Sequence, residues 1–95
     1  MTYRTALVIG AGAFGTSIAN VLTHKFEKVV LKVRSKDVYQ SLKKGSNEIY
    51  LPGKKLSKNI IPALTWEEVD DNVYEGIDLV VSGLPTSAIK DYVKN

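Results

Sequence analysis

A glycine-rich segment constrains the fold of this chain more than any other feature. It reads Gly10-Ala11-Gly12-Ala13-Phe14-Gly15. In residues 3–10, the part that follows Arg4 is an unbroken apolar run. Such a run is typical of a strand buried on both faces of a parallel sheet. Apolar side chains then recur at helical spacing, at Phe14, Ile18, Val21 and Leu22. A G-x-G-x-x-G pattern between a buried strand and an amphipathic helix is the fingerprint of a dinucleotide-binding βαβ unit.

Each glycine of this fingerprint has a physical role. Gly10 allows a tight turn, Gly12 lets the backbone approach a pyrophosphate, and Gly15 lets the helix pack closely on the strand. The backbone amides at the start of the helix, those of Ala13, Phe14 and Gly15, then face the phosphates with the helix dipole behind them. The segment therefore predicts a dinucleotide-binding turn. The alternative is a plain tight connection between strand and helix.

Strand and helix signals continue to alternate along the chain. Apolar runs predict further strands at residues 28–34, 59–64 and 77–82. Each run is followed by a residue that can begin a helix, namely Ser35, Thr65 and Pro85. This alternation predicts an α/β fold, the first half of a Rossmann-type doubly wound parallel sheet with strand order 3-2-1-4. Residues 45–58 are predicted to be a long loop with room for one extra turn, and loops of this length are often functional.

Composition and charge exclude several classes of function. The chain has no cysteine and a single histidine, His24, so we expect no disulfide, thiolate catalysis or metal cluster. No apolar run approaches the roughly 20 residues of a membrane-spanning helix, and we expect a cytoplasmic protein. Residues 25–36 carry five basic residues and one acidic residue, whereas residues 61–78 carry six acidic residues and no basic one. The acidic block would repel nucleic acid, and the basic block fits a small anionic ligand or a solvated strand end.

Arg34 occupies the position at which the fingerprint predicts an acidic residue. In NAD-binding domains an Asp or Glu about 20 residues after the glycines binds the ribose 2′-hydroxyl. Here the second predicted strand ends with Val33 and Arg34. Because a guanidinium can pair with a 2′-phosphate or stack on adenine, the cofactor is predicted to be NAD or NADP. The alternative is an exposed arginine at a strand end.

A second candidate contact follows the fourth predicted strand. Pro85 and Thr86 follow the predicted strand that neighbours the first strand across the point where the strand order reverses, and ligands bind in that crevice. Pro85 fixes the turn, and Thr86 offers a hydroxyl group to the ribose or the phosphates. Ordinary capping of the next helix explains the same residues equally well.

Several stretches of the chain together resemble a known family. They are residues 8–16, residues 29–34, Asn47 with Tyr50-Leu51-Pro52-Gly53, Leu56 with Asn59-Ile60, and residues 80–86. The chain resembles the NAD(P)-dependent glycerol-3-phosphate dehydrogenases of the bacterial type. The fingerprint is shared by many dehydrogenases, whereas the N-x-x-Y-L-P-G stretch narrows the resemblance to this family.

The resemblance implies roles for individual residues. It implies that Ala13 and Phe14 lie against the cofactor pyrophosphate and that Arg34 contacts the adenosine end. Tyr50 and the Pro85-Thr86 pair, by the same resemblance, lie near the cofactor or the crevice. Ala13 departs from the serine often found at its position, which removes a hydroxyl contact and leaves the backbone amide.

The resemblance also implies an activity, the interconversion of glycerol 3-phosphate and dihydroxyacetone phosphate by hydride transfer. Residues 1–95 then look like a truncated NAD(P)-binding domain, with the substrate domain and its catalytic lysine beyond Asn95. We therefore expect no turnover by this chain, although glycerol 3-phosphate is the expected substrate of the full-length enzyme. We also expect self-association through the edge of the fourth strand. The alternatives are a two-domain dehydrogenase of 2-hydroxy or 2-keto acids and a non-catalytic nucleotide-binding regulatory module.

Overall fold

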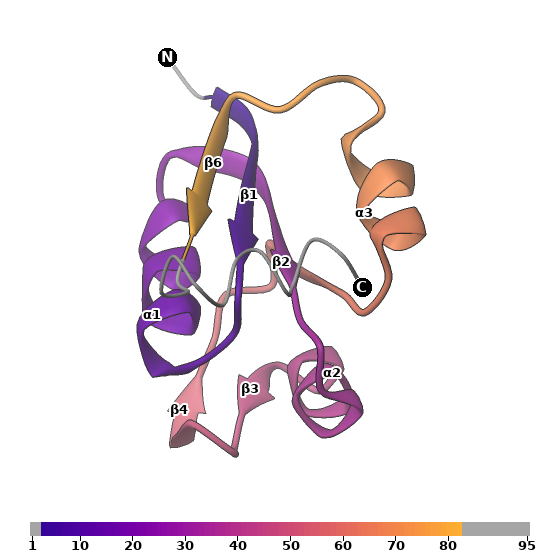
Figure 1. The fold of residues 1–95 in the computed structure, drawn as a ribbon. Helices are drawn as coiled ribbons and strands as arrows, with labels where there is room; N and C mark the ends of the chain where they lie inside the picture. Colours follow the sequence, from indigo (N-terminus) through magenta and orange to yellow (C-terminus); the bar gives the residue numbers. More distant parts are fainter. Residues whose placement is uncertain (1–2, 83–95) are drawn as a thin grey trace.

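The computed structural model describes residues 3–82, with the backbone alone for Tyr3. Its elements follow one another as β1 (Tyr3–Ile9), α1 (Ala13–Leu22), β2 (Phe26–Lys32), α2 (Lys36–Lys43), β3 (Ser46–Asn47), β4 (Leu51–Lys55), β5 (Ile60–Ala63), α3 (Trp66–Val73) and β6 (Leu79–Ser82) (Figure 1). The predicted alternation of strands and helices is confirmed by this order. The helix predicted to begin at Pro85 lies outside the described residues.

Four parallel strands form the main sheet, in the order β5-β2-β1-β6. When the short strands β3 and β4 are left out of the count, this is the predicted order 3-2-1-4 of a Rossmann-type half sheet. Strand β1 is central, because Val8 pairs with Leu31 of β2 on one side and with Val81 of β6 on the other. The carboxyl ends of the parallel strands meet at one edge of the sheet, which is the lower edge in Figure 1.

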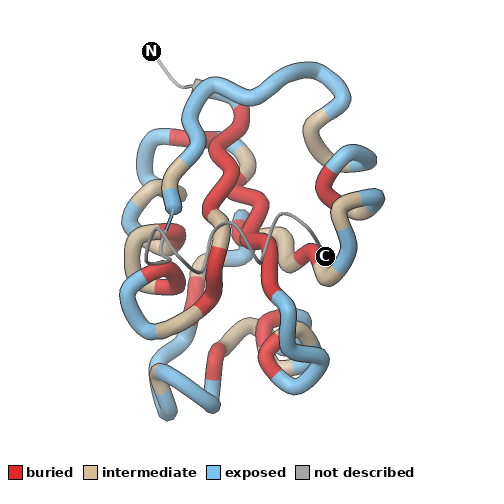
Figure 2. Tube along the Cα trace, viewed as in Figure 1, coloured by how far each residue is buried: buried red, intermediate tan, exposed pale blue. Residues whose placement is uncertain are grey.

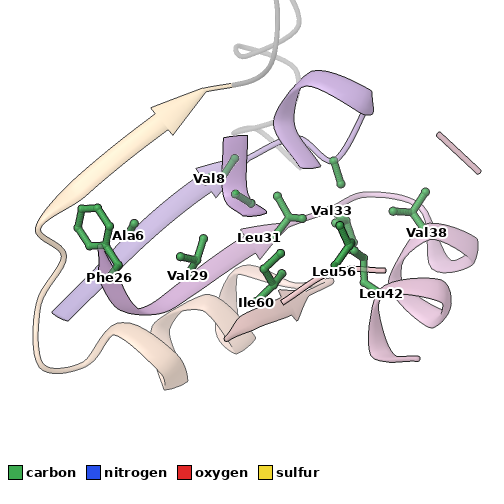
Figure 3. Packing of buried hydrophobic residues seen from close by; sticks show 12 residues of the cluster. Ala6, Val8, Phe26, Val29, Leu31, Val33, Val38, Leu42, Leu56 and Ile60 are labelled. Carbon is green, nitrogen blue, oxygen red and sulfur yellow. The ribbon is translucent and has the colours of Figure 1, made fainter. Parts of the chain in front are cut away.

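Two apolar layers cover the two faces of the sheet. On one face Val8 and Leu31 pack with apolar side chains of α1 and α2 (Figure 3). On the other face Leu7 and Val30 pack with Val69 of α3. Neighbouring residues of a strand point to opposite faces, so each central strand contributes to both layers, and the middle of β1 and of β2 is buried on both faces (Figure 2). This explains why residues 6–9 of β1 and 29–31 of β2 are apolar runs in the sequence.

Two of the three described helices begin at the side-chain caps that the sequence predicts. The Oγ atom of Ser35 accepts a hydrogen bond from Val38 N at 3.3 Å at the start of α2. At the start of α3, Thr65 Oγ1 accepts from Glu68 N at 3.1 Å, and Glu68 Oε1 accepts from Thr65 N at 3.2 Å. These bonds satisfy amides that a helix start leaves without partners. Helix α1 differs, since its N-cap residue, Gly12, provides no side-chain cap.

The prediction that residues 45–58 form a loop is wrong. Strands β3 and β4 form an antiparallel hairpin in which Ser46 pairs with Lys55 and Asn47 with Leu51. Strand β3 is only two residues long, which is too short to show an alternating pattern in the sequence. The hairpin lies at the lower edge of the sheet in Figure 1, beside the turn that joins β1 to α1.

Candidate functional site

The segment between β1 and α1 forms the tight turn that the sequence predicts. Gly10 has a φ of +98°, a conformation that L side chains rarely adopt. Its N–H donates to Lys32 O at 2.9 Å, which ties the turn to the end of β2. Gly12 has a φ of −70° and a ψ of −174°, which other residues also adopt. A Cβ on Gly12 would meet no atom of residues 3–82 within 4 Å, so this part of the chain leaves the backbone open to a ligand at this point.

The first turn of α1 offers backbone amides to an anion. This turn contains neither a capping side chain nor an acidic residue. The amides of Ala13, Phe14 and Gly15 precede the first helical hydrogen bond, which runs from Thr16 N to Gly12 O at 2.9 Å. Ala13 and Phe14 are exposed, whereas Gly15 is buried, as its predicted role in packing the helix on the sheet requires. The arrangement fits the negative charge of a pyrophosphate, since the positive end of the helix dipole lies here.

Behind the turn lies a buried polar cluster that the sequence pattern did not predict. Asn47 of β3 and Thr16 of α1 are both 0% exposed. The Nδ2 atom of Asn47 donates to Ala11 O at 2.9 Å and to Thr16 Oγ1 at 2.8 Å. Thr16 Oγ1 in turn donates to Ala11 O at 3.2 Å. The one signal in the sequence is the position of Asn47 as the first residue of the N-x-x-Y-L-P-G stretch.

Tyr50 lies in the turn between β3 and β4, close to the glycine turn. Its N–H donates to Asn47 Oδ1 at 3.3 Å, so one asparagine contacts both segments. The side chain of Tyr50 is 51% exposed. Tyr50 therefore lies at the edge of the sheet where the sequence predicts the cofactor.

Two cations lie at the carboxyl end of β2. Arg34 is exposed and directly precedes Ser35, the cap of α2. Lys32 is only 4% exposed, and its Nζ atom donates to Val33 O at 2.8 Å and lies 5.0 Å from the centre of the Trp66 ring. Burial lowers the pKa of Lys32, and the charge of Arg34 lowers it further. At this end of β2 Arg34 is thus exposed to solvent, whereas Lys32 is buried.

A hydrogen bond between side chains joins α2 to α3 near these cations. Tyr39 OH donates to Glu68 Oε2 at 2.7 Å. This bond lowers the pKa of Glu68 and raises the pKa of Tyr39, because it stabilises the carboxylate together with the phenol. Glu68 also accepts from Leu64 N at 3.1 Å. A carboxylate engaged in this way holds the helices in place, and its geometry gives no sign of an acid–base catalyst.

The rest of residues 3–82 offers little further chemistry. A pocket between the end of α2 and the start of β5 contains no residue of the glycine turn; its lining includes Lys43, Lys44 and Lys58. No group of three or more potential metal ligands occurs among the described residues. In the same part of the chain, no helix has both the length and the apolar character needed to cross a membrane. Pro85 and Thr86, two of the predicted cofactor contacts, lie outside the described residues.

Comparison with known proteins agrees with the geometry of this site. A chain from Methanothermobacter thermautotrophicus named glycerol-3-phosphate dehydrogenase [NAD(P)+] is 36% identical over 89 residues, which cover 93% of this chain and 26% of the relative. A protein of the same name from Halalkalibacterium halodurans is 29% identical over 93 residues, which cover 97% of this chain and 26% of the relative. The chain thus spans about a quarter of the length of the curated relatives it matches.

A solved structure and a family model extend this agreement. The crystal structure of glycerol-3-phosphate dehydrogenase from Coxiella burnetii superposes with a TM-score of 0.67 at 26% identity, over 85% of this chain and 24% of that chain. The family model described as NAD-dependent glycerol-3-phosphate dehydrogenase N-terminus matches residues 5–95. The match covers nearly the whole chain, and the chain therefore belongs to the family of N-terminal domains of NAD-dependent glycerol-3-phosphate dehydrogenases.

Proposed function

We propose that this chain is the cofactor-binding part of a glycerol-3-phosphate dehydrogenase and that it binds NAD or NADP. One observation carries the proposal: the first turn of α1 has glycine at its N-cap, open space in front of that glycine, and no capping or acidic side chain. Membership of the family supports the same conclusion. When it is bound, the nicotinamide supplies the chemistry by accepting or releasing a hydride.

The proposed cofactor site unites the residues singled out in the sequence. They are Gly10, Gly12, Ala13, Phe14, Gly15, Arg34, Tyr50, Pro85 and Thr86. The amides at the start of α1 bind the pyrophosphate, and Arg34 binds the adenosine end because it follows β2. The hydrogen bond between Tyr50 N and Asn47 supports a place for Tyr50 beside the pyrophosphate. For Pro85 and Thr86 the proposal rests on the sequence.

We extend the proposal to the whole protein, whose substrate is then glycerol 3-phosphate and whose product is dihydroxyacetone phosphate. The names of the relatives support this substrate. Within this scheme residues 1–95 hold and orient the cofactor, while a separate substrate domain supplies the catalytic groups. A cytoplasmic location, the expectation from the sequence, is part of the same proposal.

Calorimetric titration of NADH and NADPH into the chain tests the proposed function. We expect saturable binding of one molecule per chain, because the described residues contain one glycine turn of this kind. A chain with an intact circular dichroism spectrum that takes up neither nucleotide would contradict the proposal. An assay of the full-length protein with dihydroxyacetone phosphate and NADH, beside one with a 2-keto acid, separates the proposed activity from that of the other dehydrogenase class.

We also propose that the chain self-associates through the edge of β6, with a second copy as the partner. Strand β6 is an edge strand of the sheet and contains neither proline nor lysine. Leu79 is 38% exposed and Val80 56% exposed (Figure 2), and among the described residues α3 packs against β2 and β5. An apolar strand edge of this kind recruits other chains.

Light scattering over a concentration series measures this association. We expect the apparent mass to rise with concentration, and we expect Val80→Lys to suppress the rise because a charge on an edge strand opposes pairing. Val21→Lys is the matched control, since Val21 is similarly exposed on α1 but lies outside the sheet. A chain that stays monomeric at high concentration, or equal behaviour of the two variants, would remove the role of the β6 edge.

A further inference from the structure

Asn47 joins the two segments that the proposed cofactor site needs. It lies in β3, and its side chain is completely buried. Its contacts reach Ala11 and Thr16 around the glycine turn, and Tyr50 in the turn of the hairpin. Ala11 is 36 residues away in the sequence, so Asn47 is a tertiary link between the hairpin and the start of α1.

The partners of Asn47 fix the orientation of its amide group. Ala11 O can only accept a hydrogen bond, so the NH₂ group of Asn47 must face it. The N–H of Tyr50 can only donate, so the amide oxygen must face Tyr50. Thr16 Oγ1 donates to Ala11 O, which leaves it to accept the second proton of the NH₂ group. Both protons and the oxygen of the buried side chain are therefore used, in the one orientation that its partners allow.

The link to Ala11 controls the direction of the next backbone amide. The carbonyl group of Ala11 points into the protein, toward Asn47 and Thr16. In a planar trans peptide the N–H of the following residue points the opposite way, so the N–H of Gly12 is directed away from this buried cluster. A Cβ on Gly12 meets no atom within 4 Å on the open side of the turn. Two buried hydrogen bonds to Ala11 O thus hold the peptide between Ala11 and Gly12 in the orientation that presents this turn to a ligand.

We propose that Asn47 is a positioning residue for dinucleotide binding: it fixes the glycine turn and the turn that carries Tyr50 as one preorganised surface for the pyrophosphate. The inference rests on the proposed function, because it assumes that the glycine turn binds a dinucleotide. It adds a residue that does not touch the cofactor and acts through Ala11 and Tyr50. A surface held in place before binding loses less conformational freedom when the ligand arrives, so the effect is on affinity.

Asn47→Asp tests the proposal with almost no change of shape. Aspartate keeps an oxygen that accepts from Tyr50 N, but it places a second oxygen against Ala11 O. Both of these oxygens are acceptors, so no hydrogen bond forms between them. We expect NADH to bind about tenfold more weakly, since a buried hydrogen bond is replaced by an unsatisfied pair of acceptors. Asn20→Asp is the matched control, because Asn20 uses its amide oxygen to accept from Ser57 N at 2.9 Å and aspartate retains that oxygen. We expect the control to bind NADH with unchanged affinity.

Thr16 provides a second pair of variants for the case in which Asn47→Asp does not fold. Thr16→Val keeps the shape of the side chain but removes the hydroxyl group that links Asn47 to Ala11, whereas Thr16→Ser keeps that group. We expect Thr16→Val to lower the affinity for NADH severalfold, and Thr16→Ser to retain most of it. Equal affinities for the two variants would overturn the proposal, as would undiminished affinity in a folded Asn47→Asp variant.

Amide hydrogen exchange without ligand separates this inference from the proposed function. If Asn47 holds the two turns, exchange at their hydrogen-bonded amides, those of Gly10, Thr16 and Tyr50, should become about tenfold faster in Asn47→Asp, while the amides of β2 keep their rates. Unchanged exchange in both turns would refute the positioning role even if NADH binds. If the unaltered chain fails to bind NADH although exchange changes as expected in Asn47→Asp, the proposed function is refuted. The structural link through Asn47 is then still established.

Discussion

Replacement of Gly12 by valine is expected to abolish the binding of NADH and NADPH and to leave the fold intact. The backbone at Gly12, with a φ of −70° and a ψ of −174°, is accessible to valine. The new side chain meets no protein atom within 4 Å at its Cβ, so it occupies the space in front of the turn rather than the core. That is the space through which a pyrophosphate must approach the backbone. Calorimetric titration measures the loss, and circular dichroism checks the fold.

A smaller substitution at Gly12 tests whether the loss of binding follows the size of the added side chain. Gly12→Ala adds a single methyl group at the same point and should weaken binding less than Gly12→Val does. Glycines with a positive φ, such as Gly53 at +78°, are unsuitable controls because a side chain there strains the backbone. Unchanged affinity in Gly12→Val, with a normal circular dichroism spectrum, would remove the glycine turn from the cofactor site.

The order of the main sheet could be predicted because its signals are local. The middle of β1 and of β2 is buried on both faces, and such burial produces apolar runs in the sequence, here residues 6–9 and 29–31. Ser35 and Thr65 act on amides three residues away, so the starts of α2 and α3 are encoded within one helical turn. A parallel strand order then follows from the right-handed connection of successive strands through helices.

The hairpin and the cluster around Asn47 could not be predicted in the same way. Strand β3 has two residues, and its pairing with β4 leaves no period in the sequence. The burial of Asn47 depends on Ala11 and Thr16, which lie far away in the sequence. A polar residue in a segment without periodicity is indistinguishable from a solvated loop residue until its partners are known. The structure therefore adds the residue that connects the two predicted parts of the site.

The structure was also needed to show which cations of residues 25–36 are exposed. The sequence shows five cations between residues 25 and 36 without saying which are exposed. Lys32 is buried over the ring of Trp66, a contact between β2 and α3. Arg34, only two residues further on, is exposed. Side chains two residues apart share a face of a strand, so alternation does not separate these two cations. The end of β2 at Lys32 and the placement of α3 over Lys32 decide the difference, and the placement of α3 is a tertiary feature.

Replacement of Arg34 by alanine is expected to weaken NADPH binding by about tenfold to a hundredfold. One bidentate, charge-assisted contact with a 2′-phosphate is worth roughly 1.5 to 3 kcal/mol. Arg34 can make this contact because it is exposed just beyond β2, whereas the Nζ atom of Lys32 is directed to Val33 O and the ring of Trp66. NADH lacks the 2′-phosphate and should lose less affinity. Calorimetric titration with both nucleotides measures the two losses.

Arg4→Ala is the matched control for this prediction, and a comparison of the two cofactors identifies the contact. Arg4 is exposed and forms an ion pair with Glu75 at 2.5 Å near the start of β1, at the end of the strand opposite the glycine turn. Its removal changes the net charge as Arg34→Ala does, so a loss of affinity shared by both variants reflects long-range electrostatics. Equal losses for NADH and NADPH in Arg34→Ala alone would show that the guanidinium stacks on adenine. A larger loss for NADPH would show that Arg34 binds the 2′-phosphate, because only a group absent from NADH can produce that difference.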